Sequence, residues 1–276
     1  MAPEPASDAE AFKNFEREGY SRVAQAYDRA TAVVTSQIND AILEAVGAGP
    51  GISLLDVACG PGWLSAAAVK RGAVVTALDF AENMVAFARL RCPEADIHNA
   101  DAENLPFPAS RFDAVVCSLG LLHLPDPERA IAEAHRVLRP GGRYAFTCWT
   151  PPARNPFFGL ILGAVQKHGN MNVNIPAGPP LFRFGEPTEC ERALNTEGFT
   201  SVSVNELPMV WPFPTPEAVV PSVVASTARI GPLLAMQTAE QRRSVESAIA
   251  EGAKKYVTAQ GGVEIPTSVV LAVGQK

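Results

Sequence analysis

The stretch LLDVACGPG, residues 54–62, decides the fold of this 276-residue chain. It joins an apolar run at 52–57, typical of a buried parallel strand, to a helix that begins near Trp63. Gly60 and Gly62 allow the backbone to pass close to a ligand where a Cβ atom would clash. The first turn of the helix offers unpaired N–H groups and a positive dipole end to an anionic group. The order of strand, turn and helix predicts a ligand-binding turn, although a plain tight turn has the same pattern.

Two acidic residues follow the next two predicted strands. Asp79 ends the apolar run 73–78, where a carboxylate can accept hydrogen bonds from both hydroxyls of a ribose; it could also cap the following helix. Asp101 follows the weaker strand 96–100, where it can accept from an adenine amino group or serve as an ordinary loop acid. Because the carboxyl ends of parallel strands meet at one edge of a sheet, these signals converge. They predict a cofactor that contains adenosine.

The surrounding sequence continues the alternation of strands and helices. Helices are expected after Pro61, after Asp79 and around residues 130–138, and a turn is expected at 139–142. The alternation predicts an α/β fold with a parallel sheet, helices on both faces and right-handed crossovers. The strands expected in this part of the chain are 52–57, 73–78, 96–100, 112–119 and 143–149.

The two ends of the chain have a different pattern. Residues 1–51 are expected to form N-terminal helices in front of a cofactor-binding core at 52–150. Residues 151–276 are expected to hold two late strands, 199–211 and 265–273, separated by a mostly helical insertion. These strands would form an antiparallel hairpin at the sheet edge, and the insertion would form a helical cap. The whole chain, 1–276, is then one domain.

Composition excludes several other classes of protein. The formal net charge is −6 and no stretch concentrates Lys and Arg, which argues against nucleic acid as a partner. Met1–Glu10 lacks a basic and an apolar region, which argues against secretion, and no apolar run is long enough for a membrane span. The sequence leaves the oligomeric state open. Buried free thiols in a reducing cytoplasm are expected for the five cysteines, which show no CxxC pair: Cys59, Cys92, Cys117, Cys148 and Cys190.

Residues 52–149 resemble the class I S-adenosylmethionine-dependent methyltransferases. Within that class the chain is most similar to the group that includes the ubiquinone and menaquinone biosynthesis C-methyltransferases. One departure is Ala58, where many members have a glycine. The resemblance implies a Rossmann-like, doubly wound sheet of seven strands, mostly parallel with an antiparallel last strand, and S-adenosyl-L-methionine as cofactor. The segments that carry it are LLDVACGPG, LDFAENMV, NADAENLPFP and FDAVVCSLGLLHLPDPERAIAEAHRVLRPGG.

The resemblance also implies roles for single residues. Asp56 and the turn that follows it would border the methionine portion of the cofactor, and Asp79 would bind the ribose hydroxyls. Phe80 and Met84 would pack on adenine, and Ser118 would lie near the sulfonium. The cofactor-binding residues implied in this way are Asp56, Ala58, Cys59, Gly60, Gly62, Asp79, Phe80, Met84, Asp101, Ala102 and Ser118.

Methyl transfer needs a base only where the acceptor must lose a proton. His123 is the best-positioned candidate base, because it follows the fourth strand; it could instead only shape that loop. The mostly uncharged, aromatic cap favours a small, largely apolar acceptor such as a quinol, a polyketide or another secondary metabolite. The aromatic residues expected to face it, or to pack in the core, are Tyr20, Tyr27, Trp149, Phe157 and Phe158.

Two other functions fit parts of the pattern. A nicotinamide dehydrogenase requires G-x-G-x-x-G/A, and the third small residue would here be Ser65. The sequence has no evident Tyr-x-x-x-Lys set for hydride transfer, so this alternative is weak. A catalytically inactive protein that binds the cofactor and acts as the partner of another enzyme is the second alternative.

Overall fold

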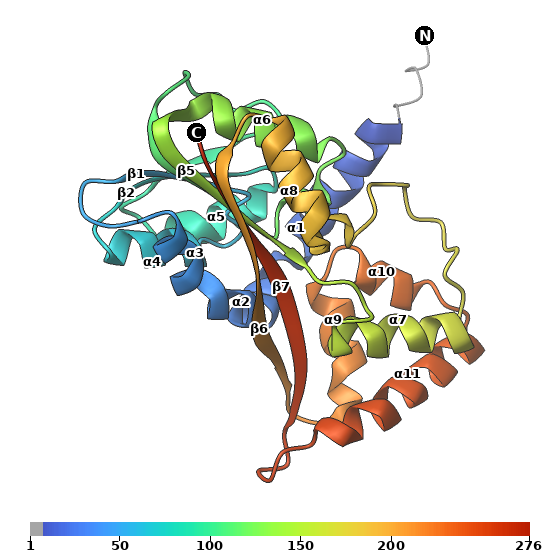
Figure 1. The fold of residues 1–276 in the computed structure, drawn as a ribbon. Coiled ribbons are helices and arrows are strands. Elements are labelled where there is room, and N and C mark those ends of the chain that lie inside the picture. Colours follow the sequence, from blue (N-terminus) through green and yellow to red (C-terminus); the bar gives the residue numbers. More distant parts are fainter. Residues whose placement is uncertain (1–7) are drawn as a thin grey trace.

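Seven strands form one sheet in the computed structural model, which describes residues 8–276 (Figure 1). Their order across the sheet is β3-β2-β1-β4-β5-β7-β6. Pairs among the first five strands are parallel, whereas β7 runs antiparallel to both of its neighbours. The predicted fold class is therefore confirmed, and the antiparallel last strand lies where the late hairpin was expected. The strands are β1 (Ser53–Val57), β2 (Val74–Asp79), β3 (Asp96–Asn99), β4 (Phe112–Ser118), β5 (Leu138–Trp149), β6 (Thr200–Phe213) and β7 (Val263–Gln275).

Helices cover both faces of this sheet. The helices α3, α4 and α5 pack together against one face, and α6 and α8 pack against the other (Figure 1). The helices of the chain are α1 (Asp8–Arg29), α2 (Thr31–Thr35), α3 (Asn39–Ala45), α4 (Trp63–Lys70), α5 (Glu82–Arg91), α6 (Pro127–Val137), α7 (Pro156–His168), α8 (Pro187–Thr196), α9 (Val219–Ser226), α10 (Ile230–Ala235) and α11 (Ala239–Ala253).

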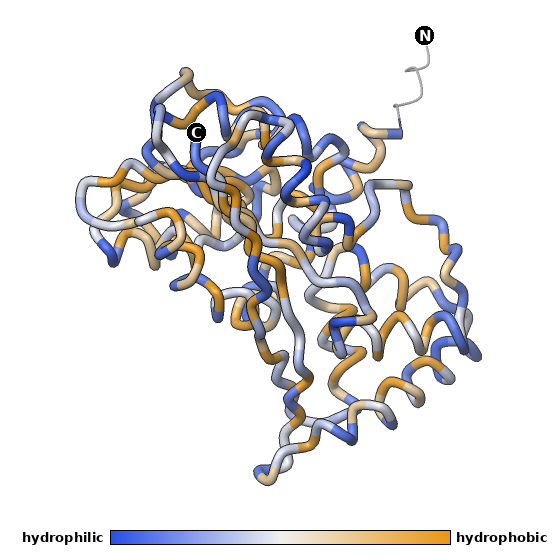
Figure 2. Tube along the Cα trace, viewed as in Figure 1, coloured by the Kyte–Doolittle hydropathy of each residue, from blue (hydrophilic) through white to orange (hydrophobic). Residues whose placement is uncertain are grey.

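The central strands are apolar because both of their faces are covered. Leu54 and Leu55 in β1 and Val115 and Val116 in β4 are fully buried, as is typical of strands between two helical layers. Figure 2 shows the hydrophobic residues gathered along the strands at the centre of the sheet. The edge strand β6 instead alternates between exposed and more buried residues over much of its length. The core therefore lies along β1 and β4, and the sequence motifs follow the carboxyl ends of the strands.

One predicted boundary is wrong. The turn expected at 139–142 lies inside β5, which begins at Leu138. The reason is long-range pairing with the end of the chain: the Gly141 N–H donates to the Lys276 carbonyl at 2.8 Å, and the Lys276 N–H donates to the Gly142 carbonyl at 2.9 Å. Gly141 keeps a turn-like φ of +80°, so the strand bends there without ending.

The helical cap stands beside the long ends of β6 and β7 (Figure 1). It consists of α7, α9, α10 and α11, in which α7 and α9 both contact α11. The N-terminal helix α1 contacts α5 in the core and α9 in the cap. It therefore bridges the two parts across the carboxyl end of the sheet.

Other expectations from the sequence concern secretion signals, membrane spans, metal sites and cysteines. The prediction on Met1–Glu10 falls largely on residues 1–7, which lie outside the described residues. Within residues 8–276 no helix combines the length and apolar character that crossing a bilayer requires. The same part of the chain holds no cluster of His, Cys, Asp and Glu suited to a metal ion. All five cysteines are buried and free.

Candidate cofactor and acceptor site

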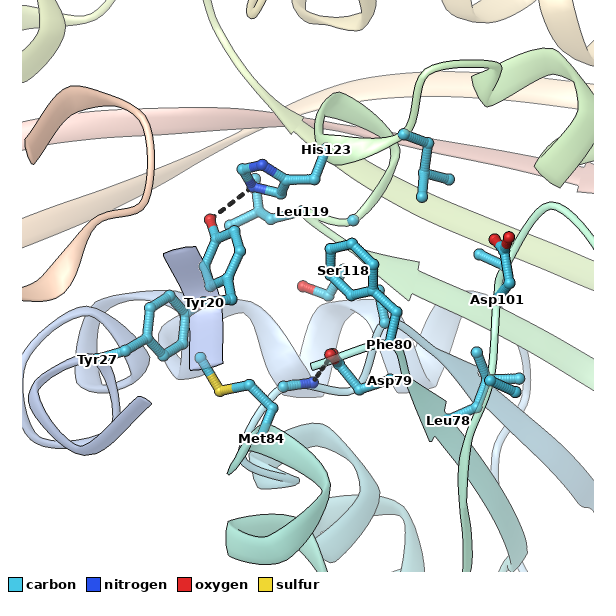
Figure 3. A pocket seen from close by; sticks show the side chains of 16 residues that line it. Tyr20, Tyr27, Leu78, Asp79, Phe80, Met84, Asp101, Ser118, Leu119 and His123 are labelled. Atoms are coloured by element: carbon cyan, nitrogen blue, oxygen red, sulfur yellow. Dashed lines mark hydrogen bonds between the residues drawn. The ribbon is translucent and has the colours of Figure 1, made fainter. Parts of the chain in front are cut away.

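Two adjoining pockets lie at the carboxyl ends of the strands. The first, here called the strand-end pocket, lies over the ends of β1, β2 and β4 and beneath α1 (Figure 3). Strand register brings these ends together, because Val57 pairs with Leu78 and Asp79 pairs with Asn99. The structure thus gathers residues from several motifs in one cavity. The predicted cofactor-binding residues that line it are Ala58, Gly60, Asp79, Phe80, Met84, Asp101, Ala102 and Ser118.

The turn after β1 has an unusual backbone. Ala58, Gly60 and Gly62 have φ values of +57°, +54° and +84°, in the left-handed region. Ala58 adopts this conformation without being glycine, at a cost of about 1–2 kcal/mol. Gly62 is required by packing, since a Cβ atom there would lie 3.0 Å from the Ala88 Cα on α5. Gly60 lines the pocket, so only one of the two glycines faces the cavity.

Asp79 holds this turn in place. Its Oδ2 accepts the Gly60 N–H at 2.9 Å (Figure 3), and its Oδ1 accepts the Ala81 N–H at 2.9 Å. Burial raises the pKa of this carboxyl to about 6, although the backbone hydrogen bonds and the nearby His123 lower it. The N-cap residue of α5 is Ala81, so Asp79 is not the cap of that helix. Each carboxylate oxygen keeps a further lone pair for a ligand.

Three predicted residues do not line the pocket. They are Asp56, Cys59 and Gly62. The buried Asp56 accepts a hydrogen bond from the Ser65 hydroxyl at 2.6 Å, which ties the end of β1 to the first turn of α4. Burial raises its pKa to about 7, against the opposing effect of Ser65. Contact between Asp56 and a ligand remains a prediction.

Helix α1 covers the far end of the strand-end pocket. The Lys13 ammonium lies 2.7 Å from Asp101 Oδ2 and also contacts Glu103. The other oxygen of Asp101 accepts the Glu103 N–H at 2.9 Å. Asp101 therefore lies at the pocket, as expected from the sequence, but one of its oxygens already has a cationic partner.

His123 stands at the inner end of the pocket with both ring nitrogens engaged. Nε2 lies 2.7 Å from the Tyr20 hydroxyl (Figure 3), and Nδ1 lies 3.1 Å from Glu16 Oε2. Glu16 is completely buried, and its other oxygen lies 3.5 Å from Arg229 Nε. Burial and the neighbouring Glu16 carboxylate raise the pKa of Tyr20 well above its usual range.

The sequence predictions did not include Glu16 and Arg229. For Glu16 a signal existed, because Glu16, Tyr20 and Tyr27 fall on one face of α1 at spacings of four and seven residues. An acid on the same helix face as two predicted site tyrosines is a recognisable pattern. Arg229 had no such signal, since it lies between α9 and α10 and reaches Glu16 only because the cap folds back.

The second pocket, here called the aromatic pocket, lies between α1, the end of β5 and the cap. Phe157 and Trp211 stack there with ring centroids 4.0 Å apart, and Trp149 lies 6.0 Å from Trp211. Its lining has one arginine, Arg229, whose charge is balanced by Glu16. The predicted acceptor residues Trp149, Phe157 and Phe158 line this pocket and not the strand-end pocket. The residues shared with the strand-end pocket are Tyr20, Tyr27, Leu119 and His123.

Comparison with known proteins finds a family that matches part of the chain. Residues 55–146 match the family described as "Methyltransferase domain". Over 142 residues the chain is 37% identical to the demethylmenaquinone methyltransferase of Renibacterium salmoninarum. The aligned region covers 50% of this chain and 60% of that protein. The chain spans 50% to 60% of the lengths of such curated relatives.

Solved structures share the fold at low sequence identity. The YcgJ protein of Bacillus subtilis has a TM-score of 0.58 at 15% identity, with 87% of this chain and 98% of that chain covered. A phosphoethanolamine N-methyltransferase 2 of Haemonchus contortus, in complex with S-adenosyl-L-methionine, has a TM-score of 0.53 at 19% identity, with 87% and 52% covered. Residues 55–146 of the chain are thus similar to methyltransferase domains, about half of the chain is similar to demethylmenaquinone methyltransferases, and the solved structures share its fold.

Proposed function

We propose that this protein transfers the methyl group of S-adenosylmethionine to a small, largely apolar acceptor such as a quinol, a polyketide or another secondary metabolite. One observation carries the proposal: a pocket lined by acids and a pocket lined by aromatic rings adjoin at a common wall. That wall consists of two tyrosines, a leucine and His123. A cofactor on one side would then present its reactive carbon to an acceptor on the other.

The residues of the strand-end pocket fit this cofactor. Asp79 has lone pairs free for ribose hydroxyls, and Phe80 and Met84 offer apolar surface to a flat base. Asp79 and Asp101 line this pocket and Asp56 is buried near it, and these acids suit a ligand that carries a sulfonium and an ammonium charge. We assign the cofactor-binding roles stated from the sequence to these residues on that basis.

The aromatic pocket supports the choice of acceptor. Its walls are rings and aliphatic side chains, and Arg229 already has a carboxylate partner, so a charged acceptor would find no free counter-ion among the lining residues. Bound S-adenosylmethionine supplies an electrophilic methyl carbon whose sulfur departs as a neutral thioether. The protein's own contribution is to align the acceptor with that carbon and to keep water out. His123 lies at the junction as the candidate base.

A methyl-transfer screen tests the proposal. Purified protein with tritiated S-adenosylmethionine would be incubated with a panel of phenols, quinols and amines, and labelled product would be extracted and counted. Cofactor binding would be measured separately by calorimetry. We expect label in a phenol or quinol product, and none with a variant that cannot bind the cofactor. Cofactor binding without product from any acceptor would instead support the inactive partner protein.

A further inference from the structure

Three side chains form a continuous line of polar contacts at the wall between the two pockets. Glu16 and Tyr20 lie one turn apart on α1 and contact opposite nitrogens of His123, at 3.1 Å and 2.7 Å. The Tyr20 and His123 rings also meet edge to face, with centroids 4.7 Å apart. His123 therefore has no nitrogen left for an acceptor. Tyr20 and His123 both line the two pockets, and the Tyr20 hydroxyl is the end of this line of contacts.

The chemistry of Glu16 fixes the direction of the hydrogen bonds. A carboxylate only accepts, so the proton of the neutral imidazole must lie on Nδ1, which faces Glu16. Nε2 is then an acceptor, and the Tyr20 hydroxyl donates to it. The remaining lone pairs of the Tyr20 oxygen stay available for a proton from a ligand.

Arg229 explains how a buried carboxylate is kept in this position. Glu16 has no exposed surface, and a buried carboxylate needs a nearby cation to compensate for lost hydration. The Arg229 guanidinium lies 3.5 Å from Glu16 Oε1 and donates to the Leu122 carbonyl at 3.1 Å, directly beside His123. Arg229 comes from the cap, so docking of the cap completes the charge arrangement behind the imidazole.

We propose that Tyr20, His123 and Glu16 form a proton relay in which Tyr20 touches the acceptor, and that Glu16 and Arg229 are positioning residues. The proposal rests on the proposed methyl transfer. As the acceptor oxygen is methylated, its O–H bond breaks and the proton goes to the Tyr20 oxygen. The original Tyr20 proton moves to His123 Nε2. The resulting imidazolium is balanced by the Glu16 carboxylate.

The environment of Tyr20 favours a proton relay over a stable phenolate form of Tyr20. Burial and Glu16 hold the pKa of this hydroxyl well above its usual range, so Tyr20 stays protonated until it passes its proton on. A concerted transfer never leaves a charge on the phenol oxygen. The acceptor class follows: it bears a hydroxyl group, as phenols and quinols do, and a tertiary amine would make no use of the relay.

The position of the imidazole proton can be measured without any methyl transfer. We would record long-range proton–nitrogen correlations of protein with ¹⁵N-labelled histidine, and assign His123 by its loss in His123→Asn. We expect the neutral ring to carry its proton on Nδ1 in the wild type, and expect Glu16→Gln to lose this preference. Glu18→Gln, on the exposed face of the same helix, should leave the spectrum unchanged. A wild-type ring protonated on Nε2 would overturn the relay.

Kinetics with an acceptor from the screen give the second test. Tyr20→Phe should lower kcat by about 100-fold or more and Glu16→Gln by about tenfold, with little change in KM or in cofactor affinity. Product from the wild type together with unchanged kcat in Tyr20→Phe contradicts the relay alone. No product from the wild type contradicts the proposed function itself, and with it any role of the relay in methylation.

Discussion

The strand-end pocket and the aromatic pocket share a wall but are built in opposite ways. Apart from the two tyrosines of α1, the strand-end pocket comes from one continuous stretch, residues 58–124. The aromatic pocket draws on α1, the end of β5, α7, β6 and the segment from α9 to α10, which are spread over most of the chain. The first is a product of local strand-and-turn geometry, and the second depends on how the cap docks.

This difference has an energetic consequence. The strand-end pocket presents Asp79, a buried acid whose raised pKa makes the pocket sensitive to pH and whose carboxylate favours a cationic ligand. The aromatic pocket presents stacked rings, which favour apolar ligands and do not titrate. Changes in one pocket should therefore affect one ligand and spare the other, except at the shared wall. The following predictions test that separation, starting with the largest expected effect.

Asp79→Ala should weaken cofactor binding most. The variant loses a buried carboxylate that we expect to accept from two ribose hydroxyls, so Kd should rise about 10–100-fold, or roughly 1.5–3 kcal/mol. Calorimetry measures this directly. Asp113→Ala is a matched control, because Asp113 also accepts a backbone N–H, from Ser53 at 2.9 Å, but does not line the pocket. Equal affinity in Asp79→Ala and the wild type would remove Asp79 from the cofactor site.

Acidification should weaken cofactor binding by a smaller amount. Burial raises the pKa of Asp79 to about 6, so the carboxylate that accepts hydrogen bonds is present above that pH and is lost below it. Affinity should fall as pH drops through 6, by about tenfold at pH 5 relative to pH 7. Titrations of cofactor into protein at several pH values measure the effect. In Asp79→Asn the decrease near pH 6 should disappear, and a flat wild-type profile would contradict the assignment.

The two pockets also differ in how far the sequence could predict them. The acids and the turn of the strand-end pocket were predictable, because each follows a recognisable strand and parallel strands end at one edge. The packing role of Gly62 was not, since it depends on the approach of Ala88 on a different helix. Arg229 was not predictable either, because its partner Glu16 lies at the other end of the chain and only the docked cap joins them.

Trp149→Phe should affect the acceptor and leave the cofactor unchanged. Trp149 lines only the aromatic pocket, and the smaller ring retains part of the stacking surface. We expect KM for an acceptor from the screen to rise about 3–10-fold, which corresponds to about 1 kcal/mol of lost aromatic contact. Trp63→Phe is the control, because this half-exposed tryptophan lies outside both pockets. A parallel rise in cofactor Kd would show that the pockets are coupled.

The smallest expected effect is on the stability of the protein without cofactor. Burial raises the folded-state pKa of Asp56 to about 7 and of Asp79 to about 6, both above the values expected in the unfolded chain. Between the unfolded-state and folded-state pKa values, the folded protein therefore binds more protons than the unfolded chain. This contribution to stability is present at low pH and is lost as pH rises through 6 and 7. The melting temperature should be a few degrees higher at pH 6 than at pH 8. Asp56→Asn should flatten this slope, whereas Trp149→Phe should keep it, because Trp149 does not line the pocket that holds Asp79. A slope that is unchanged in Asp56→Asn would mean that the pH sensitivity does not come from Asp56.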